Sequence, residues 1–228
     1  DALTLAAGAN MLSASGTETI TGQAADDALT LTTGFTGGTI NLAGGSDTLT
    51  LADATNTLSA TGIETVIGGT GADTITLTAA VSGASIDLGT GTDALTLAAG
   101  ANTLAASGVE TVTGTSSADA LTLSSGFSGG TINLSSGTDT LALANAANIL
   151  SVTGVETIIG GTDTDTVTLT AAATGLSVDL GTGTDILNLA AGTSSVTIVG
   201  VETLAGTAGA EVVTLLNTVS GLLSLIHI

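Results

Sequence analysis

The sequence predicts an all-β fold, a right-handed parallel β-solenoid (a β-roll or β-helix) of about ten coils. Three observations predict it: a repeat that runs the length of the chain, a two-residue alternation of polar and apolar side chains, and glycine-rich turns between the alternating segments. The repeat is marked by an aspartate that opens the pattern Asp-x-Leu/Ile/Val-x-Leu at steps of 26 and 20 residues in turn, so we expect coils that alternate between 26 and 20 residues. These positions are Asp1, Asp27, Asp47, Asp73, Asp93, Asp119, Asp139, Asp165 and Asp185, with Glu211 in the tenth place.

The segments between the turns have the pattern of half-buried strands. Residues 73–78 read Asp-Thr-Ile-Thr-Leu-Thr, in which apolar side chains fall on every second position. Threonine and β-branched aliphatic residues favour strands, and the flanking Gly and Ser clusters favour turns. The apolar spacing never settles at the helical period. A coil of this length holds two or three short strands, so a two-sided roll and a three-sided helix both remain open.

Stacked coils would form a narrow aliphatic core. In-register stacking places Leu3 over Leu29, followed by Leu49, Ile75 and Leu95. Each such side chain contributes roughly 1.5–3 kcal/mol when it is fully buried, whereas a coil alone would leave both faces wet. We therefore expect each coil to depend on its neighbours for stability.

The domain organisation follows from the repeat. Repeats of 46 residues begin at positions 1, 47, 93, 139 and 185, and we predict one β-solenoid array over residues 1–222. A longer period of 92 residues overlies the shorter one, which recent tandem duplication explains. It is seen in GFTGGTINL at 34–42 and GFSGGTINL at 126–134, and in SIDLGTGTD at 85–93 and SVDLGTGTD at 177–185.

The two ends of the sequence suggest a gene fragment. The chain starts within the repeat phase and without an initiator Met. Residues 223–228, LSLIHI, depart from the Gly/Thr/Ala composition and resemble the in-frame translation of a transposon adapter used in sequencing libraries. We expect a non-native, adapter-derived tail on an internal fragment of a longer protein, with a natural apolar tail as the alternative.

The composition restricts the partners. The chain has 20 Asp and Glu, no Lys, no Arg and a formal net charge of −20, which excludes nucleic acid and anionic membrane surfaces as expected partners. No apolar run approaches the roughly 18 residues of a membrane span. Hydrophobic residues reach 43%, so the chain is expected to fold rather than to remain disordered.

The repeated aspartates need a source of charge relief. In stacked coils they would lie about 4.8 Å apart. Two like charges at that distance repel by roughly 0.9 kcal/mol in water and about 3.5 kcal/mol at an effective dielectric constant of 20. A bound cation, hydrogen bonds from turn amides, and partial protonation are the three possible sources of relief.

One turn matches a calcium-binding pattern. Residues 68–76, Gly-Gly-Thr-Gly-Ala-Asp-Thr-Ile-Thr, fit the nonapeptide Gly-Gly-x-Gly-x-Asp-x-aliphatic-x. Glycine permits a tight loop that points carbonyl oxygens inward, and aspartate supplies the anionic oxygen that a hard cation requires. Together with Ile63-Glu64-Thr65-Val66, this stretch resembles the RTX (haemolysin-type calcium-binding) repeats of secreted and cell-surface bacterial proteins.

The resemblance implies a parallel β-roll that holds Ca²⁺ between its glycine-rich turns. In the family the turns recur every nine residues, in coils of about 18, whereas here the nine-residue step holds only locally, as from Val66 to Ile75. By motif match the resemblance assigns ligand roles to Gly68, Gly69, Gly71 and Asp73. Looser copies extend the predicted metal-ligand set to Gly44, Gly45, Asp47, Gly89, Gly91, Asp93, Asp163, Asp165, Gly181, Gly183 and Asp185. The turns at 22–27 and 114–119 lack the double glycine and depart from the pattern.

Simpler roles stand beside these. Each aspartate can instead accept backbone N–H bonds at its turn. The second acidic series, Gly-x-Glu-Thr, is interpreted as a solvated strand edge. It recurs at Glu18, Glu64, Glu110, Glu156 and Glu202.

The expected function is that of a structural or adhesive segment of a large secreted or cell-surface bacterial protein (adhesin, surface-layer or RTX type), stiffened by Ca²⁺. Surface proteins or glycans would bind through regions outside the fragment. We expect no enzyme: acid pairs such as Asp26 and Asp27 exist, but Lys, Arg, Tyr and Trp are absent.

Ice binding by an outward threonine array is an alternative function. Threonine occupies the fourth position of most Asp-x-Leu-x-Leu segments. Against this function, a second hydroxyl two residues later occurs only at Thr32, Thr78 and Thr170, with Ser124 as a near match.

Overall fold

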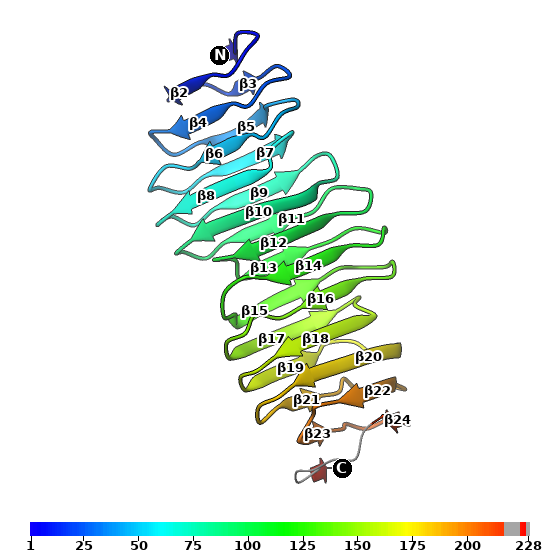
Figure 1. Ribbon diagram of the computed structural model, residues 1–228. Coiled ribbons are helices and arrows are strands. Elements are labelled where there is room, and N and C mark those ends of the chain that lie inside the picture. Colours follow the sequence, from blue (N-terminus) through cyan, green and yellow to red (C-terminus); the bar gives the residue numbers. More distant parts are fainter. Residues whose placement is uncertain (217–223, 227–228) are drawn as a thin grey trace. The chain divides into compact units, whose positions relative to one another are not determined.

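The computed structural model describes residues 1–216 and 224–226, and within them the chain forms only strands joined by turns and bends (Figure 1). The chain divides into two compact units, Asp1–Thr115 and Ser116–Ile228. Each unit is a stack of parallel strands in two sheets, which confirms the predicted all-β parallel solenoid. The division falls inside the third repeat.

In the first unit, strands with odd numbers form one sheet and strands with even numbers form the other, each in chain order. The odd sheet contains β1 (Ala2–Thr4), β3 (Thr19–Thr21), β5 (Thr36–Asn41), β7 (Thr57–Thr61), β9 (Thr74–Leu77), β11 (Ala94–Thr96) and β13 (Thr111–Thr113). The even sheet contains β2 (Met11–Ala14), β4 (Ala28–Leu31), β6 (Thr48–Thr50), β8 (Thr65–Gly69), β10 (Ser82–Gly89) and β12 (Thr103–Ser107).

The second unit repeats this arrangement. Its odd sheet contains β15 (Ser128–Asn133), β17 (Asn148–Thr153), β19 (Asp165–Leu169), β21 (Ile186–Asn188), β23 (Thr203–Ala205) and β25 (Ser224–Ile226). Its even sheet contains β14 (Ala120–Leu123), β16 (Thr140–Ala142), β18 (Thr157–Gly161), β20 (Thr174–Gly181), β22 (Ser195–Val199) and β24 (Val212–Leu215). The predicted tail, 223–228, lies outside the described residues except for the backbone of β25, which pairs with β23.

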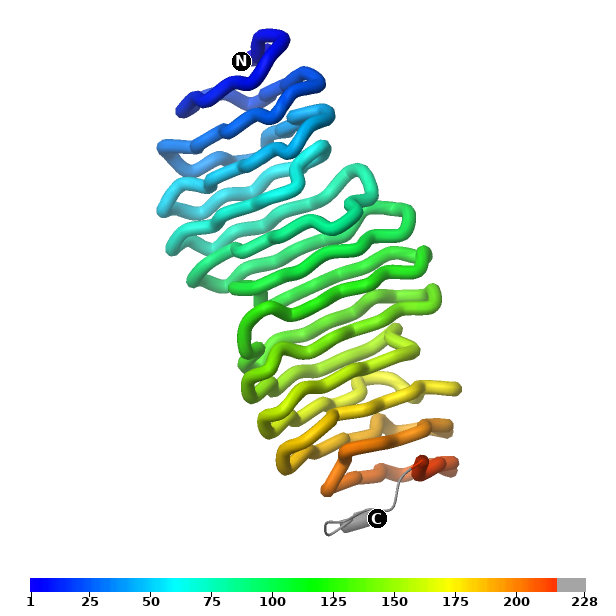
Figure 2. The backbone as a smooth tube through the Cα atoms, viewed as in Figure 1, coloured from blue at the N-terminus to red at the C-terminus, as the bar shows by residue number. Residues whose placement is uncertain are grey.

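Each coil of a unit has two sides. The backbone passes from a strand of one sheet to a strand of the other and back, as the tube in Figure 2 shows within each unit. Of the two architectures that the sequence leaves open, the structure is the two-sided roll.

The strand registers correct the predicted coil length. Leu29 lies beside Leu49, and Ile75 beside Leu95, as the shorter of the two sequence steps predicts. Leu49, however, lies beside Val66 of the glutamate segment, and not beside Ile75. Leu3 likewise lies beside Ile20 instead of Leu29.

The expectation that the longer step forms a single coil is therefore wrong. The interval from Asp1, before β1, to Asp27, before β4, spans three strands. Three strands make one and a half coils, so the longer step leads to the opposite sheet.

The same count gives the double-repeat period a structural meaning. Residues 1–46 contain the five strands β1 to β5, and residues 47–92 contain β6 to β10. Because five is odd, β1 and β11 open their repeats in the odd sheet whereas β6 opens its repeat in the even sheet. Two repeats, which hold ten strands or five coils, are needed to return to the same sheet, and the average coil then has about the length of two nonapeptides.

The core is the predicted thin layer of small aliphatic side chains between the sheets. Ile20, Ile40, Leu49, Ile75 and Leu95 are at most 1% exposed. The residues beside each of them on the strand point outward, which explains the two-residue alternation in the sequence.

A truncation in this core should be costly. We expect Leu49→Ala to lower the free energy of unfolding by about 2–5 kcal/mol, because it leaves a cavity between coils that cannot collapse fully. Thr50→Ala, on the outer face of the same strand, is the matched control and should change it by about 0.5 kcal/mol at most. Guanidinium titration followed by circular dichroism measures both; equal effects would contradict the assigned register.

Candidate functional site

The repeated polar residues lie at the starts of strands, on both edges of the roll. In the second repeat, Asp47, Asn56, Glu64 and Asp73 directly precede β6, β7, β8 and β9. Because successive strands belong to opposite sheets, Asp47 and Glu64 lie at one edge while Asn56 and Asp73 lie at the other. The expectation that all the repeated aspartates stack on one another in successive coils is therefore wrong, since they divide between two edges.

At each edge the side chains join consecutive coils. At the odd-sheet edge of the first unit, the backbone N–H and Nδ2 of Asn56 donate to Oδ1 of Asp73 at 2.9 and 2.8 Å. The N–H of Asp73 donates to Oδ1 of Asp93 at 2.7 Å, and the N–H of Asp93 to Oε2 of Glu110 at 2.7 Å. We call such a series, in the order Asn, Asp, Asp, Glu, an acid ladder.

The other edge of the first unit carries the same ladder. Asn10 donates through its N–H and Nδ2 to Oδ1 of Asp27 at 2.8 and 2.7 Å. Asp27 donates to Oδ1 of Asp47 at 2.7 Å, and Asp47 to Oε2 of Glu64 at 2.8 Å. The two edges thus carry the same series of hydrogen bonds, and the residues of one series lie one repeat further along the chain than those of the other.

The second unit contains the ladder at both of its edges. At one edge, Asn148 donates to Asp165, Asp165 to Asp185 and Asp185 to Glu202. At the other edge, Asp119 donates to Asp139 and Asp139 to Glu156. The N–H···O distances of these five bonds are 3.0, 2.7, 2.8, 2.7 and 2.8 Å, in that order.

At Asn56 and Asn148 the ladder begins with a neutral side chain whose hydrogen bonds are complete. Oδ1 of Asn56 accepts the N–H of Phe35 at 3.1 Å, and its Nδ2 also donates to the carbonyls of Ala52 and Ala54 at 3.0 and 2.7 Å. The carboxylates therefore occur in groups of three, with an asparagine and an apolar residue between groups. This interruption limits the accumulation of like charge along an edge.

The aspartates of the ladders are buried, at 2% exposure or less, while the glutamates that end the ladders are half-buried. Each Oδ1 accepts the hydrogen bonds described above. The second carboxylate oxygen, Oδ2, is buried without a hydrogen-bond partner at Asp27, Asp47, Asp73, Asp93, Asp139 and Asp185. A buried carboxylate with one oxygen unmatched is costly in its charged form.

Burial raises the pKa of the second aspartate in each group, namely Asp47, Asp93, Asp139 and Asp185. The amide hydrogen bond from the preceding coil lowers these pKa values, and the neighbouring Asp and Glu charges raise them. The pKa of Asp185 reaches about 6. Hydrogen bonding by amides, one of the three predicted forms of relief, is thus present but incomplete.

The glycines of the predicted calcium turns have a steric role in the fold. Gly89 pairs with Gly69, and a Cβ on Gly89 would collide with the carbonyl of Gly69. A Cβ on Gly71 would strike the carbonyl of Ala54, and one on Gly91 that of Gly71. The glycines at 45, 68, 181 and 183 likewise face backbone atoms of a neighbouring coil, whereas Gly44 has open space around it.

Within residues 1–216 and 224–226, no three His, Cys, Asp or Glu side chains converge as a metal-binding group. The predicted ligands Asp47, Asp73, Asp93, Asp165 and Asp185 are ladder members, whereas Asp163 is exposed. Calcium coordination by them and by the glycine carbonyls stays a prediction.

Sequence reasoning missed the glutamates and the asparagines. Glu64, Glu110, Glu156 and Glu202 are hydrogen-bond acceptors for a buried aspartate amide, and not the solvated strand edges that the sequence suggested. Their constant separation from the preceding aspartate of the same edge was a usable signal. The asparagines recur at the same position of the first four repeats, at 10, 56, 102 and 148, with Ser194 in the fifth, and offered another.

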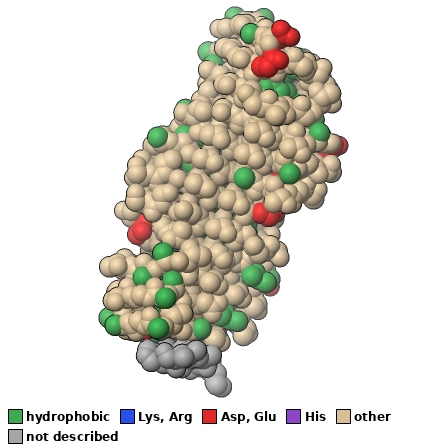
Figure 3. All heavy atoms as spheres, turned by 180° about the vertical axis from the view of Figure 1, so that it is seen from behind, with side chains coloured by type: hydrophobic (Ala, Val, Ile, Leu, Met, Phe, Trp, Pro, Cys, Tyr) green, Lys and Arg blue, Asp and Glu red, His purple; other side chains and the backbone are tan. Residues whose placement is uncertain are grey.

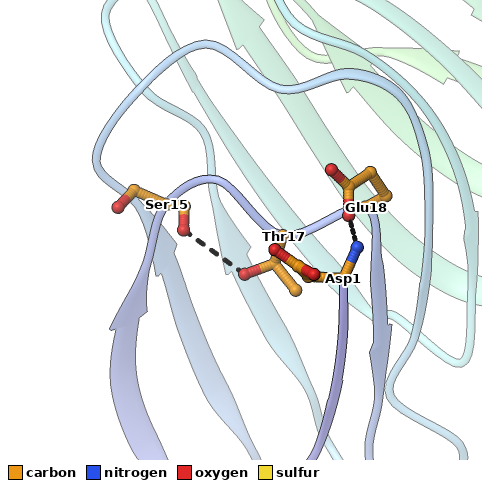
Figure 4. Close-up of polar contacts among 4 residues, drawn as sticks. All are labelled: Asp1, Ser15, Thr17 and Glu18. Carbon is orange, nitrogen blue, oxygen red and sulfur yellow. Dashed lines mark hydrogen bonds and ion pairs between the residues drawn. The ribbon is translucent and has the colours of Figure 1, made fainter.

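The first copy of the glutamate contact is drawn in Figure 4. The N-terminal amine of Asp1 contacts the carboxylate of Glu18, in the place where the amide of Asp47 meets Glu64 in the next repeat. The hydroxyl of Thr17 donates to the carbonyl of Ser15 at 3.3 Å in the adjoining turn. The contact therefore recurs even where the residues are exposed.

Eight of the 20 acids are buried, and the others are exposed or half-buried. On the face in Figure 3, acidic side chains appear only at separate points, as expected when the ladders are buried. No helix in the described part of the chain is long and apolar enough to span a membrane.

The fold and the ladders define a class: a two-sided parallel β-solenoid whose coils are joined by buried carboxylates. Comparison with protein-family models, with curated proteins and with solved structures found no match to this chain.

Loss of one asparagine should weaken a ladder at its start. We expect Asn56→Ala to lower the free energy of unfolding by about 2–4 kcal/mol, because it removes the donors to Asp73 and to two carbonyls and leaves the Phe35 amide unpaired. Thr57→Ala, one residue later and exposed, is the control and should cost about 0.5 kcal/mol or less. Chemical denaturation measures both, and a neutral Asn56→Ala would show that the ladder does not stabilise the fold.

The raised pKa values predict that acid stabilises the fold. The folded chain retains protons that the unfolded chain releases between about pH 4 and pH 6, so stability is lost as the pH rises through that range. For Asp185 the rise of the pKa to about 6 means that the free energy of unfolding is about 3 kcal/mol larger when this carboxyl is protonated than when it is ionised.

The melting temperature should accordingly rise when the pH is lowered from 8 to 5. Asp185→Asn should reduce this rise, because it removes one of the titrating carboxyls. Calorimetry at constant ionic strength tests both statements, and a melting temperature that falls on acidification would refute them.

Proposed function

We propose that this chain is a structural repeat segment of a large secreted or cell-surface bacterial protein, of the adhesin, surface-layer or RTX type. One observation carries the proposal: the repeated aspartates are buried and join each coil to the next through hydrogen bonds, so they serve the fold. Adhesive partners, surface proteins or glycans, would bind to regions outside this sequence.

The acid pairs named in the sequence support a structural role over catalysis. Asp27 is 2% exposed and accepts from Asn10, while Asp26 accepts the N–H of Ser46 at 2.8 Å. A catalytic acid and base need access to a substrate between them. These two carboxylates are instead occupied by backbone donors of neighbouring coils.

Calcium is proposed as the partner that neutralises part of the ladders. Three observations support it: a formal charge of −20 with no Lys or Arg, buried Oδ2 atoms without partners, and coils whose average length matches the two nonapeptides that the RTX resemblance implies. Since Ca²⁺ is abundant outside cells, this partner agrees with an extracellular or cell-surface location. A metal-free solenoid is the alternative, favoured by the amide bonds that already reach each Oδ1.

A calcium titration separates the two. We expect Ca²⁺ added after chelation to raise the melting temperature, with about 2.7 kcal/mol of stabilisation per site at one hundred times its dissociation constant. Asp73→Asn, in the strict Gly-Gly-x-Gly-x-Asp turn, should reduce the shift. Asp27→Asn is the matched control, because Asp27 holds the same ladder position after a turn without the double glycine.

The outcome distinguishes the proposals. Equal circular dichroism and equal melting temperatures in chelator and in Ca²⁺ would support the metal-free solenoid. If Asp73→Asn and Asp27→Asn reduce the calcium-induced rise in melting temperature equally, calcium binding does not depend on the Gly-Gly-x-Gly-x-Asp turn.

A further inference from the structure

The outer face of the odd sheet in the first unit carries two rows of small side chains, all but one of which bear a hydroxyl. Strands β7, β9, β11 and β13 each place two residues outward on either side of a buried Leu, Ile or Val. The strand registers align these residues across the sheet. The first row is Thr57, Thr74, Ala94 and Thr111, and the second row is Ser59, Thr76, Thr96 and Thr113; together we call these eight residues the hydroxyl face.

This arrangement overturns the sequence argument against a threonine array. A second hydroxyl two residues after the first occurs at few positions, such as Thr78, so that column is broken. In the structure the companion row lies two residues earlier, and its strands β7, β9, β11 and β13 follow an asparagine, two aspartates and a glutamate of the ladder in turn. The second row also continues through Thr39 in β5 to Thr19 in β3.

The spacing of the face is set by the sheet. Neighbouring strands are about 4.8 Å apart, and residues two positions apart on one strand are about 6.7 Å apart. Seven of the eight positions carry a hydroxyl, and six of those also carry a methyl group. Thr57, Thr74 and Thr111 are exposed and the other five residues are partly exposed, so the hydroxyls form a regular, accessible lattice.

The face is also uncharged, although the chain carries a formal charge of −20. The carboxylates nearest to it precede its strands: Asp73 and Asp93 are at most 1% exposed, and Glu110 is half-buried and accepts the N–H of Asp93. An uncharged face with donors, acceptors and methyl groups complements a neutral, hydrogen-bonding surface better than an ion.

The other sheet of the same unit is chemically different. Ile67, which is 45% exposed, lies beside the exposed Asp87 on the even sheet. One repeat earlier, on the odd sheet, the equivalent neighbours are Thr21 and Asn41. The pair Ile and Asp returns on the even sheet of the second unit as Ile159 and Asp179.

This difference follows the double-repeat period, which is the distance along the chain between equivalent strands of one sheet. A strict single repeat would have made the two faces identical, because it alternates between the sheets. The sequence thus distinguishes one face from the other, which a purely structural solenoid does not require.

We propose that the hydroxyl face binds ice. Its occupant is an ordered lattice of water, to which an uncharged and regularly spaced array of hydroxyl and methyl groups is complementary. The repeat distances of the array are comparable with those between water oxygens on ice planes. A neutral polysaccharide is the less suitable occupant, because the chain has no Trp or Tyr on which sugar rings stack.

The test uses the whole chain in calcium-containing buffer at about millimolar concentration. We expect measurable thermal hysteresis and faceted ice crystals. Thr76→Tyr, at the centre of the second row, should remove most of the hysteresis because the ring lifts the face off the ice. Thr50→Tyr, at the partly exposed second outward position of β6 on the even sheet, is the matched control and should leave it unchanged.

Melting temperatures of both variants show whether they fold as the parent chain does. If Thr76→Tyr fails to fold, Thr96→Tyr in the same row serves in its place. Absence of hysteresis in the folded parent chain, or an equal loss in both variants, overturns the proposal. Retention on an insoluble neutral polysaccharide without hysteresis also overturns it and assigns the face to a glycan; all of these outcomes leave the proposed structural function intact.

Discussion

The hydrogen bond from a backbone amide of one coil to the carboxylate of the next is the interaction on which the rest of this structure depends. It occurs where the chain enters a strand, and its acceptor is a buried aspartate or a half-buried glutamate of the next coil. Since the chain has no Lys or Arg, each such bond brings an uncompensated negative charge into the fold. The grouping of the carboxylates in threes, with Asn56 and the Phe35 amide at one boundary, limits the resulting repulsion.

The odd number of strands in a repeat affects both the edges of the roll and its outer faces. It distributes one sequence motif over two edges, so both edges are held by the same ladder. It also allows the two outer faces to differ in composition. Equivalent residues of successive repeats lie on opposite sheets, whereas equivalent residues of every second repeat lie on the same sheet. Thr21 and Ile67 occupy equivalent repeat positions and yet belong to different faces. The ladders that join the coils therefore follow the single repeat, whereas the composition of each outer face follows the double repeat.

The sequence was sufficient for the strands and the inward residues, because a two-residue alternation is a local property that Ile75 and its neighbours display directly. It was insufficient for the coil length. A step that contains three strands can close one three-sided coil or one and a half two-sided coils, and only contacts between coils, such as Leu49 with Val66, distinguish them. The ladders were missed for the same reason: Asn56 and Glu110 act on residues of the neighbouring coil, far away in the sequence.

The choice between aspartate and asparagine follows from what surrounds the second side-chain atom. Nδ2 of Asn56 reaches the carbonyls of Ala52 and Ala54, so both ends of the amide are satisfied. Oδ2 of Asp93 has no partner, and an asparagine there would bury two unmatched donors. A carboxylate at that place can reduce its cost by taking up a proton or a cation, whereas an amide cannot. The unsatisfied oxygens therefore make the stability of the solenoid depend on the solution around it.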